Sequence, residues 1–132
     1  MEITVDEYTS PILITVEPNA NLDEALELMQ GNGIRHLPVL ENGKILGIIS
    51  ERDLLFHVGK DWCRMMVVRD IMQEDILTVQ RNDDLGEVAY LLSSGKVGSA
   101  IVLEDDRPYG IFTTTDALNA LVDLGQENYI HS

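Results

Sequence analysis

The sequence predicts a mixed α/β fold of the α+β type, built from two copies of a unit with the order strand, helix, strand, strand, helix. Three observations predict it. The chain matches itself after a shift of 63 residues, each copy contains an amphipathic helix pattern, and each copy places turn residues between two apolar runs. A chain of 132 residues is near the lower limit for two separate domains, so we expect the two units to pack together.

The repeat runs through the chain without a gap. The string GIISERD at residues 47–53 recurs as GIFTTTD at residues 110–116. Such self-similarity at a fixed spacing indicates a duplicated structural unit. We assign residues 1–62 to the first unit and residues 63–132 to the second.

The first helix of each unit is predicted by the spacing of its apolar residues. These residues recur at i, i+3, i+4 and i+7, which places them on one face of an α-helix. They are Leu22, Ala25, Leu26 and Met29 in the first unit, and Leu85, Val88, Ala89 and Leu92 in the second. A capping-box pattern begins each helix, at Asn21 and at Asp84. Glycines stand where each helix is expected to end, at Gly31 or Gly33 and at Gly95.

Two antiparallel strands are predicted after each of these helices. Asn42-Gly43 separates the apolar runs HLPVL and ILGII, and Asn-Gly in that setting is a strong signal for a β-hairpin. In the second unit Asp105-Asp106-Arg107-Pro108 takes the same place. Pro108 cannot donate a ladder hydrogen bond, so we place it at an edge or at a strand start.

The remaining segments are assigned by their apolar character. Short strands are expected around ILITV and ILTV, ahead of the first helix of each unit. The stretches LLFHV and ALNALVDL, which follow the two repeated motifs, have helical character. Residues 59–67 show no clear period and are interpreted as a partly helical linker.

The charge of the chain excludes several kinds of partner. Nine basic residues and 23 acidic ones give a formal net charge of −14, which repels nucleic acids and anionic membrane surfaces. We therefore expect no nucleic acid and no membrane as partners. A phosphate-bearing ligand would require the few basic residues to gather at one place.

The sequence contains little that would support catalysis or metal binding. The three histidines show no spacing typical of a nucleophile and its base, and the acidic stretch 104–106 lacks the ligand spacing of a calcium loop. No glycine-rich loop of the Walker or Rossmann type is present. We expect no enzyme activity, no catalytic cofactor and no metal. The single Cys63 excludes an internal disulfide, and the acidic start of the chain is unlike a signal peptide, so we expect a cytoplasmic protein.

The segments TSPILITVEPNANLDEALELM, IRHLPVLENGKILGIISERDLL and VVRDIMQEDILTVQRNDDL strongly resemble the CBS domain, named after cystathionine beta-synthase. The resemblance covers nearly the whole chain. It implies a tandem pair, or Bateman module, in which two CBS units pack about a pseudo-twofold axis and leave two clefts. In that family the clefts bind adenosine nucleotides or relatives such as S-adenosylmethionine.

The most specific shared element is Gly-apolar-apolar-Ser/Thr-x-x-Asp, and both copies satisfy it. The resemblance implies that Asp53 and Ser50 contact the ribose and phosphate of a ligand in one cleft, and that Asp116 and Thr113 do so in the other. The same string also fits a capping box at the start of a helix. Both interpretations stay open at this point, and they can coexist.

The resemblance also implies that each cleft takes its base pocket from the first strand of the other unit. The residues so implied are Asp75 and Leu77 for the Asp53 cleft, and Thr9, Ile12, Ile14 and Pro38 for the Asp116 cleft. The resemblance further implies that three basic residues, Arg35, His36 and Arg52, belong to the Asp53 cleft; the alternative is that the two arginines lie on the solvated surface. Their counterparts in the other cleft are Gly98, Ser99 and Thr115, none of which carries a cation.

These observations lead to one functional hypothesis and its alternatives. We expect a regulatory module that senses AMP, ADP or ATP in the Asp53 cleft, while the Asp116 cleft takes a less charged adenosine compound or stays empty. The alternatives are a scaffold or dimerisation subunit with empty clefts, and a module that binds S-adenosylmethionine. The leucine-rich helices after the motifs favour a homodimer, and the regulated partner protein is unidentified.

Overall fold

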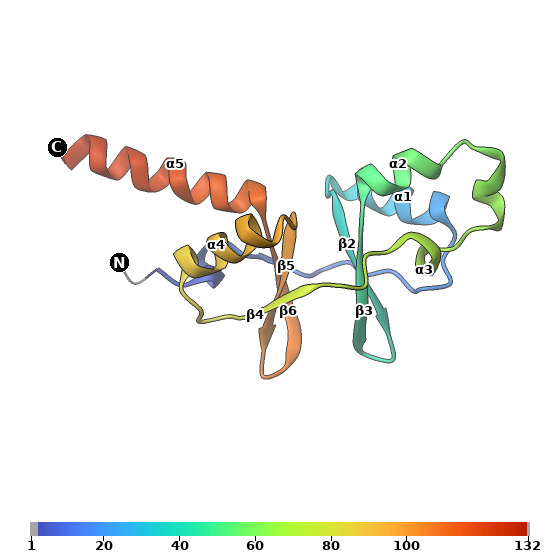
Figure 1. The fold of residues 1–132 in the computed structure, drawn as a ribbon, viewed down its shortest axis with the longest axis horizontal. Helices are drawn as coiled ribbons and strands as arrows, with labels where there is room; N and C mark the ends of the chain where they lie inside the picture. Colours follow the sequence, from blue (N-terminus) through green and yellow to red (C-terminus); the bar gives the residue numbers. More distant parts are fainter. Residues whose placement is uncertain (1–2, 132) are drawn as a thin grey trace. The chain divides into compact units, whose positions relative to one another are not determined.

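The computed structural model describes residues 3–131, and its helices and strands confirm the α+β class (Figure 1). The chain divides into two units. One is Leu13–Ile76, and the other combines the described residues up to Ile12 with those from Leu77 onward. Each unit therefore contains one segment that belongs to the other repeat along the sequence. The boundary after residue 62 divides the repeats along the sequence and stays a prediction.

The unit Leu13–Ile76 is built on a hairpin of two antiparallel strands. Single bridges extend it on both sides, because Val16 pairs with Val39 and Gln73 pairs with Ile48. Figure 1 shows α1 and α2 beside this hairpin, and the two helices contact each other. The elements are α1 (Leu22–Asn32), β2 (His36–Glu41), β3 (Lys44–Ser50), α2 (Glu51–His57), the 3-10 helix η2 (Asp61–Met65) and α3 (Val68–Ile71).

The other unit holds a four-stranded sheet in the order β1-β6-β5-β4. β5 and β6 form the hairpin, β4 runs parallel to β5, and β1 is antiparallel to β6. The elements are the 3-10 helix η1 (Val5–Tyr8), β1 (Ser10–Pro11), β4 (Leu77–Gln80), α4 (Leu85–Gly95), β5 (Ser99–Glu104), β6 (Arg107–Thr113) and α5 (Thr114–His131).

The 63-residue repeat is visible in the strand register. The pair Ser10–Ile111 corresponds to the pair Gln73–Ile48, and both hairpins have a bulge one residue after the equivalent valine. Each hairpin is thus flanked by the N-terminal segment of the other repeat. This exchange of segments explains why the two units do not follow the order of the repeats.

The predicted helix ends are largely confirmed. The Asn21 side chain accepts a hydrogen bond from the Glu24 N–H at 2.8 Å, and α1 is capped at its C-terminal end by Gly33, which is left-handed with φ 64°. α4 begins after Asp84 in the same way. Its left-handed residue is Lys96 rather than Gly95, which is the last residue of the helix.

The predicted hairpins are also confirmed. Both central turn residues have positive φ in each, Asn42 and Gly43 in one and Asp105 and Asp106 in the other, as a two-residue turn that matches the strand twist requires. Pro108 is the second residue of β6, an interior strand, so it marks a strand start and not an edge. The segment ILITV was expected to be a strand, but it contributes only the single bridge at Val16, whereas ILTV forms β4.

Each unit has its own apolar core. In the unit Leu13–Ile76 the core includes Leu22, Leu37 and Ile49, all fully buried. In the other unit Phe112 and Val88 occupy the centre, and Val5 of η1 packs against them. The exchanged N-terminal segment is therefore part of the core that it joins.

An ion-pair cluster fixes that N-terminal segment. In the unit Leu13–Ile76, Arg69 pairs directly with Glu41 at 3.4 Å. The repeat places Asp6 and Glu104 at the corresponding positions, which would bring two carboxylates together. Arg81 compensates the repulsion between these two carboxylates, since its Nε lies 3.0 Å from Asp6 Oδ2 and its Nη1 lies 2.9 Å from Glu104 Oε1.

Candidate functional site

The two repeated motifs occupy the last residues of β3 and β6 and the first turns of α2 and α5. Close backbone contacts explain why each motif begins with glycine. A Cβ on Gly47 would lie 2.5 Å from the Gln73 carbonyl oxygen, and a Cβ on Gly110 would lie 2.7 Å from the Ser10 carbonyl oxygen. Only glycine allows the exchanged segment to approach each hairpin this closely.

In the first motif, Ser50 is the N-cap of α2, and its Oγ accepts a hydrogen bond from the Asp53 N–H at 3.1 Å. The capping interpretation is therefore correct for the hydroxyl. The Asp53 carboxylate behaves differently, because it takes part in no hydrogen bond or ion pair with any residue that the structure describes. No described residue therefore occupies an acceptor position of this half-buried acid, and its role in ligand binding stays a prediction.

Basic residues lie beside this acid. The Arg35 carbonyl accepts a hydrogen bond from the Glu51 N–H at 2.8 Å, and His36 faces Ser50 in the strand register. Arg52 belongs to the first turn of α2. Arg35 and Arg52 are exposed, and neither forms an ion pair within the described part of the chain. The backbone thus places Arg35, His36 and Arg52 around the start of α2, where Asp53 lies, and the contacts of their side chains with a ligand stay predictions.

The two residues implied for the base pocket of this cleft belong to different units. Asp75 is exposed, belongs to the unit that carries Asp53, and follows Gln73, whose backbone pairs with Ile48. Leu77 is the first residue of β4, in the other unit, and faces Ala100 in the register. The base contacts of Asp75 and Leu77 stay predictions.

In the second motif the aspartate closes a complete capping box. The Thr113 Oγ1 accepts a hydrogen bond from the Asp116 N–H at 3.3 Å. One oxygen of Asp116, Oδ2, accepts from the Thr113 N–H at 2.8 Å and from the Thr113 hydroxyl at 3.0 Å. Thr115 is exposed, and the counterparts of the basic residues are Gly98 and Ser99 as expected. Sequence reasoning could not detect this difference, because both motifs carry the same pattern.

The residues that were expected to wall the Asp116 cleft also belong to different units. Thr9 and Ile12 lie in the unit of Asp116, where the Thr9 hydroxyl donates to the Val5 carbonyl at 2.8 Å and the Ile12 N–H donates to the Tyr109 carbonyl at 3.1 Å. Ile14 and Pro38 lie in the other unit, and Pro38 is buried in β2. Their contacts with a base stay predictions.

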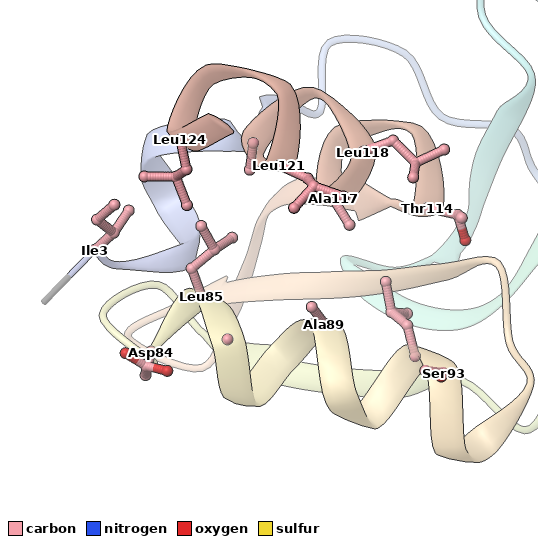
Figure 2. A pocket seen from close by; sticks show the side chains of 13 residues that line it. Ile3, Asp84, Leu85, Ala89, Ser93, Thr114, Ala117, Leu118, Leu121 and Leu124 are labelled. Carbon is pink, nitrogen blue, oxygen red and sulfur yellow. The ribbon is translucent and has the colours of Figure 1, made fainter. Parts of the chain in front are cut away.

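A second feature, which sequence reasoning did not identify as a pocket, is an apolar groove between α4 and α5 (Figure 2). We call it the α4–α5 groove; its volume is about 600 Å³. Figure 2 shows Leu124 of α5 pointing toward Leu85 of α4. Leu118 and Leu121 of α5 border the groove and are 56% and 65% exposed. The spacing of the leucines on α5 is the feature of the sequence that could have predicted this groove.

Other kinds of site find no support in the described residues. They contain no group of three or more His, Cys, Asp or Glu side chains that could hold a metal ion. Among the helices of residues 3–131, none has the length and apolar character needed to cross a membrane.

Comparisons with known proteins identify the family. The model of the CBS domain family matches residues 5–60 and again residues 68–123. A CBS domain-containing protein of Dictyostelium discoideum is 30% identical, with 94% of both chains covered. The protein MJ1225 of Methanocaldococcus jannaschii is 28% identical over 86% of this chain, which spans only 45% of that relative's length. Matches to archaeal proteins named homoserine O-acetyltransferase cover 24% of their length.

Solved structures agree with this assignment. CBSX2 in complex with AMP is 28% identical, with a TM-score of 0.77 and coverage of 92% of this chain and 98% of that one. The CBS domain of a bacterial CNNM/CorC family Mg²⁺ transporter in complex with ATP is 25% identical, with a TM-score of 0.81 and coverage of 92% and 88%. The chain therefore belongs to the CBS domain family and carries two copies of that domain in tandem.

Proposed function

We propose that this CBS pair is a regulatory module that binds an adenosine nucleotide, AMP, ADP or ATP, at the Asp53 site. The observation that carries the proposal is the Asp53 carboxylate, which no described residue engages, in the helix turn that contains Arg52 and that is hydrogen-bonded to the Arg35 backbone. Neither arginine forms an ion pair within the described chain. The structures of similar CBS proteins with AMP and with ATP support the ligand class.

The chemistry of the site matches the parts of a nucleotide. The Asp53 carboxylate accepts hydrogen bonds from the ribose hydroxyls, and the Ser50 hydroxyl donates to a ligand oxygen. Arg35 and Arg52 make charge-assisted hydrogen bonds to phosphate oxygens, with His36 beside them. These cations offset the net charge of −14 at the one place where an anion must bind. Asp75 and Leu77 supply contacts for the base.

The second site is proposed to differ in ligand. Thr113, Thr115 and Asp116 offer no cation, so this site takes a less charged adenosine compound or stays empty. Thr9, Ile12, Ile14 and Pro38 are the proposed walls for a base there. S-adenosylmethionine, which carries no phosphate, is the alternative ligand for this site.

The proposed role is sensing and not catalysis. A ligand shifts a protein between two states only to the extent that it binds one state more tightly. Nucleotide binding at Asp53 would therefore change the state that a regulated partner protein recognises. A reducing compartment such as the cytoplasm is our proposal for its location, in keeping with the free and buried Cys63.

Isothermal titration tests the proposal. Arg52→Ala is expected to weaken AMP binding by about tenfold or more, because a charge-assisted bond to phosphate is lost. Arg107→Ala is the matched control, since Arg107 is exposed and is the first residue of β6, outside both repeated motifs. Equal losses in both variants, or no binding of AMP, ADP or ATP to the wild type, would refute the proposal.

A second candidate function, dimerisation or scaffolding, is favoured by the α4–α5 groove. We propose that a second copy of the chain covers it. The occupant is the exposed apolar surface of α2 and η2, which we call the α2–η2 patch: Leu55, Phe56, Trp62 and Met65, exposed by 54%, 63%, 52% and 90%. Apolar surfaces of this kind typically mark interaction sites.

Charge favours contact of the α4–α5 groove with the α2–η2 patch of a second copy over contact between two α4–α5 grooves. The α2–η2 patch carries a cation, because the Lys60 Nζ lies 3.6 Å from the centre of the Phe56 ring. The α4–α5 groove is lined by Asp84 and by no basic residue of the described chain. Two grooves face to face would bring like charges together, whereas the patch brings an opposite charge.

A further inference from the structure

We propose that the two motif aspartates have divided roles, with Asp53 receiving the ribose of a nucleotide and Asp116 serving as the N-terminal cap of α5. Each chain would then bind one nucleotide. This inference rests on the proposed function and specifies which of the two sites performs it.

The hydrogen bonds of Asp116 are the first observation that supports a capping role. A carboxylate offers about four acceptor positions, two on each oxygen. The Thr113 N–H and the Thr113 hydroxyl already occupy Oδ2, at 2.8 and 3.0 Å. A ribose that presents two neighbouring hydroxyls to both oxygens would have to displace these bonds. Asp53 has no such bonds within the described chain and can accept both hydroxyls.

The two hydroxyl groups of the motifs show the same division. Thr113 has a single hydroxyl proton, and it is donated to Asp116. Ser50 accepts from the Asp53 N–H at 3.1 Å but donates to no atom of the described residues. Its proton therefore remains for a ligand oxygen. The first site offers both a donor and an acceptor, whereas in the second site the hydroxyl donates to the carboxylate and the carboxylate also accepts from the Thr113 N–H.

The first turns of the two helices explain why the roles separated. An acidic side chain there stabilises the positive end of the helix dipole. α2 has two acids in its first turn, Glu51 and Asp53, so Glu51 can serve the dipole while Asp53 serves a ligand. The residue of α5 that corresponds to Glu51 is Thr114, and Asp116 is the only acid of that turn. α5 has 18 residues, and Asp116 accepts two of the hydrogen bonds at its start.

Substitution by glutamate separates the two roles. Glutamate is a usual last residue of a capping box, so it preserves the cap, but its longer side chain moves the carboxylate away from a ribose. We expect Asp53→Glu to weaken AMP binding by about tenfold or more. Asp116→Glu is expected to leave AMP affinity unchanged, and titration of the wild type is expected to give one AMP per chain.

The unfolding temperature of the ligand-free protein provides the second readout. Asp116→Ala is expected to lower it by about 4 °C, because a helix cap is lost, whereas Asp53→Ala is expected to leave it unchanged. Two AMP per chain, or equal losses of affinity in the two glutamate variants, would overturn the inference. So would equal unfolding temperatures of the two alanine variants. If the wild type binds no nucleotide, the proposed function and the ligand role of Asp53 fail, while the unfolding temperatures still decide whether Asp116 is the cap.

Discussion

Replacing the motif glycine by alanine should disrupt the exchange of segments between the repeats. A Cβ on Gly47 would lie 2.5 Å from the Gln73 carbonyl oxygen, a distance that real Cβ atoms essentially never show. That oxygen accepts a hydrogen bond from the Ile48 N–H at 3.0 Å, and the Gln73 N–H donates back at 2.8 Å. The segment must move away to admit the methyl group, which strains both bonds.

The expected cost follows from the size of the clash. Forcing an extra methyl group into packed structure costs about 1–3 kcal/mol. With an unfolding entropy of about 2.1 cal/mol/K per residue, a chain of 132 residues has an unfolding entropy of about 0.28 kcal/mol/K. A cost of about 2 kcal/mol therefore lowers the unfolding temperature of Gly47→Ala by about 7 °C.

Thermal unfolding followed by circular dichroism measures this shift. Gly31→Ala is the matched control, because Gly31 lies in α1 and a Cβ there meets nothing within 4 Å. Helix propensity predicts that Gly31→Ala raises stability by about 1 kcal/mol. If Gly47→Ala unfolds at the same temperature as Gly31→Ala, the close approach of the exchanged segment is not what requires glycine in the motif.

Three further predictions concern the ion-pair cluster and the oligomeric state. Arg81→Met is expected to lower the unfolding temperature, because Asp6 and Glu104 then face each other without a cation; an unchanged temperature would contradict the cluster's role. The Thr4 hydroxyl and the Arg81 guanidinium lower the pKa of Asp6. The stability that Asp6 contributes is therefore present above the ordinary aspartate pKa and is lost as the pH falls through the lower pKa of the folded state. Acid unfolding curves should show this loss in the wild type and not in Asp6→Asn. Light scattering is expected to show a dimer that Leu121→Asp and Lys60→Glu each weaken, and a monomeric wild type would refute the proposed pairing.

Much of the fold followed from local patterns in the sequence. The 63-residue repeat, the helix caps at Asn21 and Asp84 and the Asn42-Gly43 turn are each defined by neighbouring residues, and the structure confirms them. The CBS family and the position of both motifs at the start of a helix were predicted for the same reason. The strand expected at ILITV failed because a ladder depends on partners that are distant in the sequence.

The division between Asp53 and Asp116 was decided only by the tertiary structure. Both residues end the same motif, and a sequence pattern does not specify which donor a carboxylate meets. That choice depends on the side-chain torsion and on whether another acid lies in the same helix turn, as Glu51 does in α2. The sequence alone shows that each repeat has a hydroxyl at the end of its hairpin and an acid three residues later, in the first turn of the next helix. Which acid has no hydrogen-bond partner follows only from the folded chain, because hydrogen-bond partners are set by positions in space.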